Sequence, residues 1–188
     1  DVYKRQRYFY PQLDKEALII DDRANGGGNV SPMILERLSR EPYRLTMRRG
    51  SARIGTVPDA VQVGPKVCLI NKYSASDGDL FPWGFRALGL GKLIGTRTWG
   101  GIVGISGSLP YMDGTDIRVP FFTSFDPKTG NWIIENQGVD PDILIDNDPV
   151  KEWNGEDQQL DRAIQEVMKE LQNRKPLPGV PTPRDFSK

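Results

Sequence analysis

The chain has 188 residues, of which 37% are hydrophobic and 27% charged; this is about the size of one domain and enough to bury a core. Its 25 lysines and arginines balance 25 aspartates and glutamates, so the net charge is zero, and a nucleic-acid binder, which needs a basic face, is not expected. The chain has a single cysteine, Cys68, which excludes a disulfide framework and a cysteine-based zinc site. It has no histidine, which excludes a histidine-based metal site and Ser-His or Cys-His catalysis by this chain alone.

The two ends of the chain are unlike the rest. Residues 1–6 (DVYKRQ) resemble the translation of a transposon-end adapter used in sequencing libraries, so we expect an artefact there and a protein that extends upstream; an ordinary basic tail is the alternative. These residues lack the apolar core of a signal peptide, and no stretch approaches the roughly 18 apolar residues of a membrane span. Residues 174–188 are proline-rich and predict an extended tail.

The first hundred residues alternate predicted strands with predicted helices. Strands are expected at residues 16–23, 66–73 and 92–98, and helices at residues 29–40 and 77–90. The first strand is an apolar run stopped by glycines, which is typical of a strand buried on both faces. Asn29 or Ser31 suits the cap of the first helix. The alternation predicts an α/β domain with a parallel or mixed sheet.

The pattern changes after residue 100. A β-hairpin is predicted, with arms at 109–112 and 117–119 around an Asp-Gly turn at 113–116. A short strand is expected at 131–134, and apolar residues at helical spacing predict an amphipathic helix over 156–172. The fold class is therefore α/β, with a β-hairpin region and a C-terminal amphipathic helix.

The first candidate motif is the glycine turn at residues 25–28 (NGGG), between the first strand and the first helix. Consecutive glycines permit positive φ and expose amide N–H groups, which at a helix start hold a phosphate, a carboxylate or an oxyanion. The segment has neither the lysine of a Walker loop nor the spacing of the dinucleotide fingerprint. From these residues alone, a plain flexible turn remains the alternative.

The second candidate motif is the turn before the second helix, which contains Ser74, Ser76 and Asp77. A serine on a strand-to-helix turn with small neighbours is presented for nucleophilic attack, as in the nucleophile elbow of other hydrolases, although the GxSxG pattern is absent. The amide of Asp77 is then placed to donate to an oxyanion. The alternative is that Ser74 or Ser76 simply caps the helix.

The third candidate motif is residues 135–142 (ENQGVDPD). Glu135 follows an apolar segment and is a candidate for a partly buried carboxylate that orients a partner group. Asp140 and Asp142, on either side of a proline, are more simply interpreted as turn residues.

Each motif is weak alone, but their order and spacing resemble those of the tricorn protease family. The resemblance rests on residues 71–81 (NKYSASDGDLF) and 88–101 (LGLGKLIGTRTWGG), with the 25–28 turn before them and the 135–142 segment after them. It covers most of residues 16–173. It implies that residues 7–173 are the C-terminal catalytic, tail-specific-protease-like domain of a serine peptidase that cleaves oligopeptides, with a crotonase-like βα spiral as its fold.

The resemblance also implies a role for each site residue. Ser76 matches the family's nucleophile, and the amides of Gly28 and Asp77 match its oxyanion hole. Glu135 matches a glutamate that acts through a serine hydroxyl to orient the catalytic histidine. In the family that serine and histidine lie in an upstream domain, which explains the lack of histidine here and predicts that this chain alone is inactive. No metal or organic cofactor is implied.

At some positions the sequence differs from related enzymes, and these differences limit which properties of the family are expected of this chain. Tail-specific proteases place a lysine base in the segment resembling residues 95–102, where this sequence has Gly101, so Ser-Lys catalysis is not expected. In the family's archetype an acidic residue selects substrates with basic side chains at the cleavage site. Residues 44–46 contain no such acid, which favours a preference for apolar substrate side chains. Arg48 and Arg49 either bind a substrate carboxylate or form a solvated face.

The expected partners also follow from the resemblance. They are oligopeptide substrates, upstream β-propeller and PDZ-like domains of the same full-length chain, and further copies in a homo-oligomer, which is a hexamer in the archetype. A cytoplasmic location is expected, with a periplasmic or secreted one as the alternative. The competing function is a non-catalytic relative that binds peptides or other ligands.

Overall fold

A computed structural model describes residues 7–51, 53–107 and 110–182 of the chain. Its centre is a parallel sheet of four strands in the order β1 (Leu18–Asp21), β4 (Lys66–Ile70), β5 (Gly91–Gly95) and β8 (Ile143–Leu144). The predicted α/β class with a parallel sheet is confirmed. The adapter interpretation concerns residues 1–6, which lie outside the described residues.

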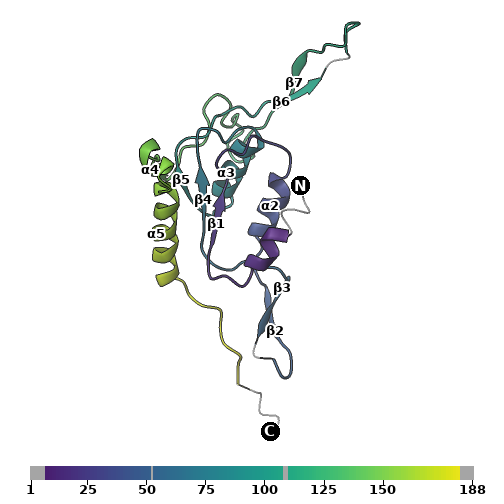
Figure 1. Cartoon of the computed structure of the whole chain (residues 1–188). Coiled ribbons are helices and arrows are strands. Elements are labelled where there is room, and N and C mark those ends of the chain that lie inside the picture. The colour runs from purple at the N-terminus through teal and green to yellow at the C-terminus, as the bar shows by residue number, and fades with distance from the viewer. Residues whose placement is uncertain (1–6, 52, 108–109, 183–188) are drawn as a thin grey trace.

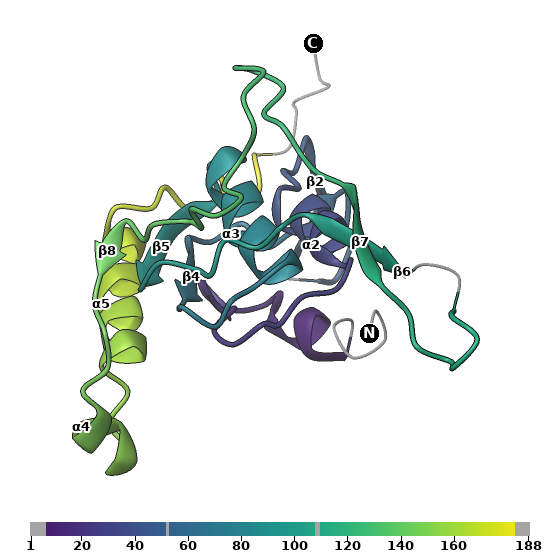
Figure 2. The same ribbon diagram turned by 90° about the horizontal axis from the view of Figure 1, so that it is seen from above.

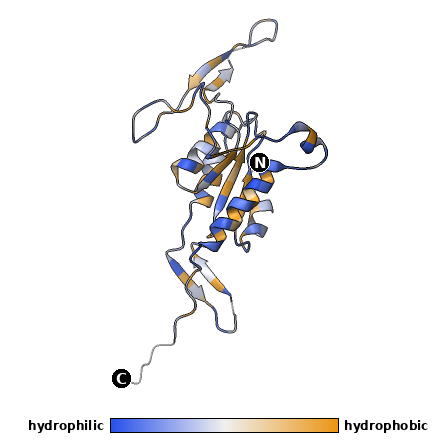
Figure 3. Ribbon diagram, turned by 90° about the vertical axis from the view of Figure 1, so that its left-hand side faces the viewer, coloured by the Kyte–Doolittle hydropathy of each residue, from blue (hydrophilic) through white to orange (hydrophobic). Residues whose placement is uncertain are grey.

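Helices cover both faces of the sheet (Figure 1). Helices α2 (Ser31–Leu38) and α3 (Asp77–Ala87) pack on one face, and α5 (Gln158–Gln172) packs on the other. Alternate residues of a strand point to opposite faces, so β4 sends Cys68 and Ile70 to the first core and Val67 and Leu69 to the second. Figure 3 shows these hydrophobic strands between more hydrophilic helices.

The first strand agrees in part with the prediction of burial on both faces. Leu18 and Ile20 pack against the first core and Ile19 against the second, but none of the three is fully buried. Strand β1 is only half-buried and lies at the edge of the described sheet, paired with β4 alone. All five residues of β4, by contrast, are buried. The apolar sequence of β1 resembles that of a central strand, and sequence alone does not reveal which strand has a neighbour on each side.

Two antiparallel hairpins extend from this body. Strands β2 (Arg44–Met47) and β3 (Ile54–Val57) form one that the sequence did not indicate. Strands β6 (Gly104–Gly107) and β7 (Arg118–Phe122) form the other, which projects from the domain in Figure 2. The expected first arm at 109–112 is not a strand where it is described: Leu109 lies outside the described residues, and residues 110–112 have no strand. The Tyr111 N–H instead donates to the Thr115 carbonyl at 2.7 Å, across the tight turn.

The C-terminal half contains the predicted long helix and two elements that were not predicted. Helix α5 falls within the expected 156–172, and the Asp157 side chain caps it by accepting from the Leu160 N–H at 3.0 Å. Strand β8 and helix α4 (Pro149–Trp153) were not expected. The strand expected at 131–134 is reduced to one isolated bridge between Phe125 and Trp132.

The remaining pieces are short. A 3-10 helix, η1 (Tyr10–Gln12), precedes β1. Residues 174–182, in the segment interpreted as a tail, have no helix or strand, and residues 183–188 lie outside the described part. Among the described residues no helix is long and apolar enough to cross a membrane.

Candidate active site

The three turns that follow β1, β4 and β5 meet at one edge of the sheet. Parallel strands end at a common edge, which is where α/β sheets form their sites. The glycine turn and the serine turn are joined directly, because the Ala75 N–H donates to the Asn25 carbonyl at 2.8 Å. The turn after β5 joins the serine turn through the Trp99 N–H, which donates to the Ser74 carbonyl at 2.9 Å.

Ser76 has a strained backbone. It is the N-cap residue of α3, as a capping role requires, but its φ of 58° and ψ of −114° are rare for a residue with a side chain. Its N–H donates to the Asp79 carboxylate at 2.9 Å. A conformation of this kind at a sharp strand-to-helix turn presents the serine side chain outward. Ser74 is different: it is fully buried, and its hydroxyl donates to the Asp22 carbonyl at 2.9 Å.

The glycine turn lies against the Ser76 side chain. A Cβ atom added to Gly27 would lie 2.8 Å from the Ser76 Cβ and 3.1 Å from its hydroxyl oxygen, and φ there is +114°. Only glycine fits this position without displacing the serine. The Gly27 N–H is already bonded, because it donates to the Asn25 side-chain oxygen at 3.1 Å.

Two other amides at this edge are free to donate. No acceptor for the N–H of Gly28 or of Asp77 is found within the part of the chain that the structure describes. Gly28 is exposed, and a Cβ added there would lie 4.0 Å from the Asp77 carboxylate, so the two residues are neighbours. The two residues predicted to supply oxyanion donors are therefore neighbours: Asp77 directly follows Ser76, and Gly28 directly follows the glycine that lies against the Ser76 side chain.

The Asp77 carboxylate connects the two helix starts. One of its oxygens accepts from the N–H groups of Val30 and Ser31 at 2.9 and 3.0 Å, and the Ser31 hydroxyl donates to the Asp77 carbonyl at 3.1 Å. The expected cap of α2 was Asn29 or Ser31, and this is wrong: Val30 is the N-cap, without a side-chain bond of its own. A carboxylate from another helix satisfies the free N–H groups instead.

Asp79 is a site residue that sequence reasoning missed. Its side chain is fully buried, and its two oxygens accept from the N–H groups of Ser76 at 2.9 Å, Gly100 at 2.7 Å and Gly101 at 3.2 Å. It therefore fixes the turn after β5 relative to the serine turn. The signal available in the sequence was its position three residues after the cap, where a capping box has its acidic residue.

Gly101 stands where the related tail-specific proteases are expected to have a lysine. A Cβ at this position would lie 2.1 Å from the Trp99 indole ring. A lysine here would therefore require the ring to move. The indole is 67% exposed, so Trp99 is not a core residue.

Glu135 is fixed to the same loop. Its Oε2 accepts from the N–H groups of Ile102 and Val103 at 2.7 and 2.9 Å, and the next residue, Asn136, donates its N–H to the Gly100 carbonyl at 2.6 Å. Among the described residues Oε1 has no hydrogen-bond partner. Glu135 therefore connects to Ser76 through the Gly100 turn and Asp79, and no direct contact joins the two side chains in the described part.

The acidic residues after Glu135 have more than a turn role. Asp142 accepts from the Leu93 N–H at 2.7 Å and pairs with Arg86 at 3.0 Å, while Asp140 pairs with Arg97 at 2.6 Å. They attach the 135–142 segment to β5 and α3. The described residues contain no group of three or more side chains suited to a metal ion.

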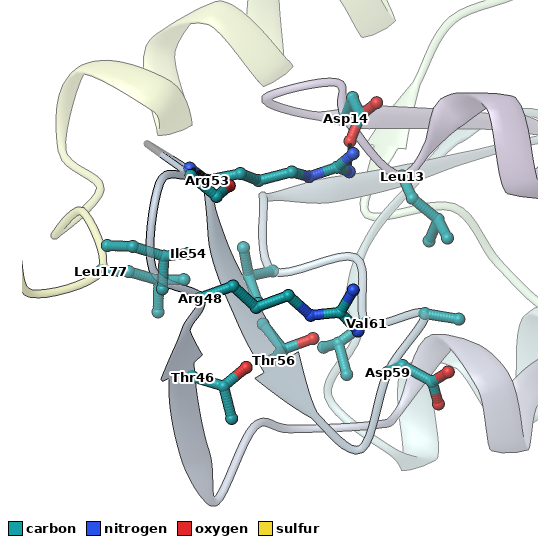
Figure 4. A pocket seen from close by; sticks show the side chains of 14 residues that line it. Leu13, Asp14, Thr46, Arg48, Arg53, Ile54, Thr56, Asp59, Val61 and Leu177 are labelled. Carbon is teal, nitrogen blue, oxygen red and sulfur yellow. Dashed lines mark hydrogen bonds and ion pairs between the residues drawn. The ribbon is translucent and has the colours of Figure 1, made fainter.

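Arg48 lines a cleft of about 520 Å³ beside the β2–β3 hairpin (Figure 4), and Ser76 is not among the residues that line it. The cleft is also lined by Arg53, whose guanidinium is paired with Asp14, and by Leu177 from the tail. Because the cleft does not include Ser76, the structure gives no support to Arg48 as a ligand for a carboxylate held at Ser76.

The fold and the three turns define a class: an α/β domain that presents a serine at a strained strand-to-helix turn beside two free amides. The chain belongs to peptidase family S41, whose family model matches residues 2–145. It is 41% identical over 172 residues to the tricorn protease of Thermoplasma volcanium, covering 90% of this chain and 16% of that protein. It is also 41% identical over 168 residues to the tricorn protease of Thermoplasma acidophilum, covering 89% of this chain and 15% of that protein.

A solved structure agrees. A crystal structure of the tricorn protease superimposes with a TM-score of 0.84 at 39% identity, covering 92% of this chain and 17% of the other. The resemblance to the tricorn family is thereby confirmed. The chain spans less than a fifth of the length of these relatives.

Proposed function

We propose that the chain is the nucleophile-bearing part of a serine peptidase that hydrolyses peptide bonds of oligopeptides. The observation that carries the proposal is the strained Ser76 beside the free amides of Gly28 and Asp77. A nucleophile next to two convergent N–H donors is the arrangement that acyl transfer needs. Membership of peptidase family S41 supports the same reaction class.

In the proposed mechanism the Ser76 hydroxyl oxygen attacks the peptide carbonyl carbon and gives its proton to a histidine base. The C–O bond forms, and the carbonyl oxygen becomes an oxyanion that accepts from the amides of Gly28 and Asp77. The C–N bond then breaks and the amine leaves with the proton. Water attacks the acyl-enzyme in the same way, which releases the acid and restores Ser76.

The base is proposed to come from outside this chain, because the sequence contains no histidine. Glu135 is proposed to orient it through an upstream serine hydroxyl. The unpartnered Oε1 supports this role, since the other oxygen already accepts from two amides and is fixed in place. We also propose that the full-length protein has upstream β-propeller and PDZ-like domains and assembles as a homo-oligomer. The proposed fold of this domain is a crotonase-like spiral. The proposed location is the cytoplasm, with a periplasmic or secreted location as the alternative.

The proposal is tested on the full-length protein that carries this chain. Ser76→Ala is expected to abolish cleavage of a fluorogenic peptide library and labelling by a peptidyl phosphonate, while leaving the melting temperature nearly unchanged. Ser51→Ala, which removes an exposed hydroxyl near the β2–β3 hairpin, is the matched control and is expected to retain full activity. The 188-residue chain alone is expected to be inactive.

Two outcomes contradict the proposal. Retained hydrolysis in Ser76→Ala rules out Ser76 as the nucleophile. A full-length protein that binds peptides and cleaves none of them favours the non-catalytic alternative.

A further inference from the structure

Asp22 is a buried carboxylic acid that the proposed mechanism does not use. It directly follows β1, and its side chain is 6% exposed. Its N–H donates to the Leu69 carbonyl at 2.9 Å, and its own carbonyl accepts the Ser74 hydroxyl at 2.9 Å. The backbone of Asp22 is thus fixed between the glycine turn and the serine turn.

The side chain of Asp22 orients Asn25. One carboxyl oxygen, Oδ1, accepts from the Asn25 side-chain amide at 2.9 Å, so the Asn25 side-chain oxygen faces the Gly27 N–H, at 3.1 Å. The Asn25 carbonyl accepts from the Ala75 N–H at 2.8 Å. Asp22 therefore determines, through Asn25, where the glycine turn lies against the serine turn.

The other carboxyl oxygen is isolated. Asp22 Oδ2 is buried and has no hydrogen-bond partner in the described part of the chain. The charged groups that act on it are all acidic: Asp21 on β1, and Asp77 and Asp79 on α3. Cys68 on β4 also faces it, and burial raises the pKa of that thiol well above its usual range. An anion at Asp22 would lack a counter-ion and would be surrounded by negative charge.

Burial is the main cause that raises the pKa of Asp22 from 3.8 to about 8, and the acidic neighbours add to it. The hydrogen bond from Asn25 acts in the opposite direction. The carboxyl is therefore protonated at neutral pH, as some buried carboxylic acids in enzymes are.

We infer that Asp22, as a neutral acid, is the positioning residue of the glycine turn, and that peptide hydrolysis declines when Asp22 ionises. The inference rests on the proposed peptidase function. An anion at Asp22 adds negative charge between the two turns that carry the proposed oxyanion donors. It therefore opposes the transition state, in which the substrate carbonyl oxygen becomes negative, more than the ground state.

The test is the pH dependence of kcat/KM for the full-length enzyme and three variants. The wild type is expected to lose activity about tenfold per pH unit above the ionisation of Asp22. Asp22→Asn cannot ionise and its oxygen still accepts from Asn25, so it is expected to lose the alkaline decline, with neutral activity lowered up to about threefold. Asp22→Ala releases Asn25 and is expected to lose about 10²-fold at neutral pH, the scale of one oxyanion donor.

Asp59→Asn is the control, because it removes an exposed carboxylate beside the β2–β3 hairpin. It is expected to keep the wild-type profile. An alkaline decline that persists in Asp22→Asn overturns the inference while Ser76-dependent hydrolysis still supports the peptidase. A wild type without Ser76-dependent hydrolysis at any pH overturns both. If Asp22→Ala fails to fold, the Asp22→Asn profile still decides.

Discussion

The buried acid at Asp22 predicts an unusual pH dependence of stability, which is measured without any assay of activity. Its pKa is 3.8 when exposed and about 8 in the folded protein. Between these two values the folded state holds a proton that the unfolded state has released. The free energy of unfolding therefore falls as the pH rises from 4 to 8, and replacement by asparagine removes this loss.

The magnitude follows from the size of the pKa shift. Each pH unit between the two values changes the free energy of unfolding by about 1.4 kcal/mol for one proton. From pH 4.5 to 7.5 the stability of Asp22→Asn relative to the wild type is therefore expected to rise by about 4 kcal/mol. Other carboxylates, such as Asp157, whose pKa is lowered by its hydrogen bond from Arg23, titrate alike in both proteins and cancel in the difference.

Urea unfolding at several pH values between 4.5 and 7.5 measures this difference. Asp59→Asn is again the control, and its stability relative to the wild type is expected to stay constant with pH. Parallel stability curves for the wild type and Asp22→Asn would refute the reasoning, because they would mean that Asp22 ionises equally readily in the folded and unfolded states.

Two further predictions concern the carboxylates that accept backbone N–H groups. Asp79→Asn leaves the Gly100 N–H facing an amide NH2 group. We therefore expect the free energy of unfolding in urea to fall by about 2–4 kcal/mol and hydrolysis to become slower. An unchanged unfolding midpoint would contradict the assigned contacts. Glu135→Gln is expected to lower kcat about 10- to 100-fold with little change in KM, because it misaligns the base without removing a reacting group. A loss as complete as that of Ser76→Ala would give Glu135 a more direct role.

The features that the sequence predicted correctly are those with a local signal. The spacing of apolar residues predicts both the alternation of strands and helices and the amphipathic helix α5. The glycine turn and the serine turn were recognised by composition. The two motifs alone left Ser74 and Ser76 open, and the family resemblance favoured Ser76. The structure gives the two serines different surroundings, because Ser74 is buried and bonded to Asp22, whereas Ser76 has the strained backbone.

The features that were missed depend on contacts between residues far apart in the chain. Asp77 caps α2 from 46 residues away, and Asp79 reaches Gly100 across 21 residues. The residues around α2 carry no signal that a side chain of another helix caps it. The β2–β3 hairpin was missed for a different reason, because its short arms are mostly exposed or half-buried and lack strict apolar alternation.

Carboxylates that accept backbone N–H groups connect the turns of the candidate site. In the proposed reaction this chain therefore supplies the nucleophile and the oxyanion donors, and not the base. Asp77, Asp79 and Glu135 each accept from at least two amides of a neighbouring turn or helix start. All of these contacts lie within the chain, so the turns that carry the proposed oxyanion donors are connected to one another by the chain's own carboxylates. Such fixed dipoles stabilise charge without reorganisation. Proton transfer, by contrast, needs a base that a chain without histidine does not supply, so the two halves of the proposed reaction belong to different parts of the full-length protein.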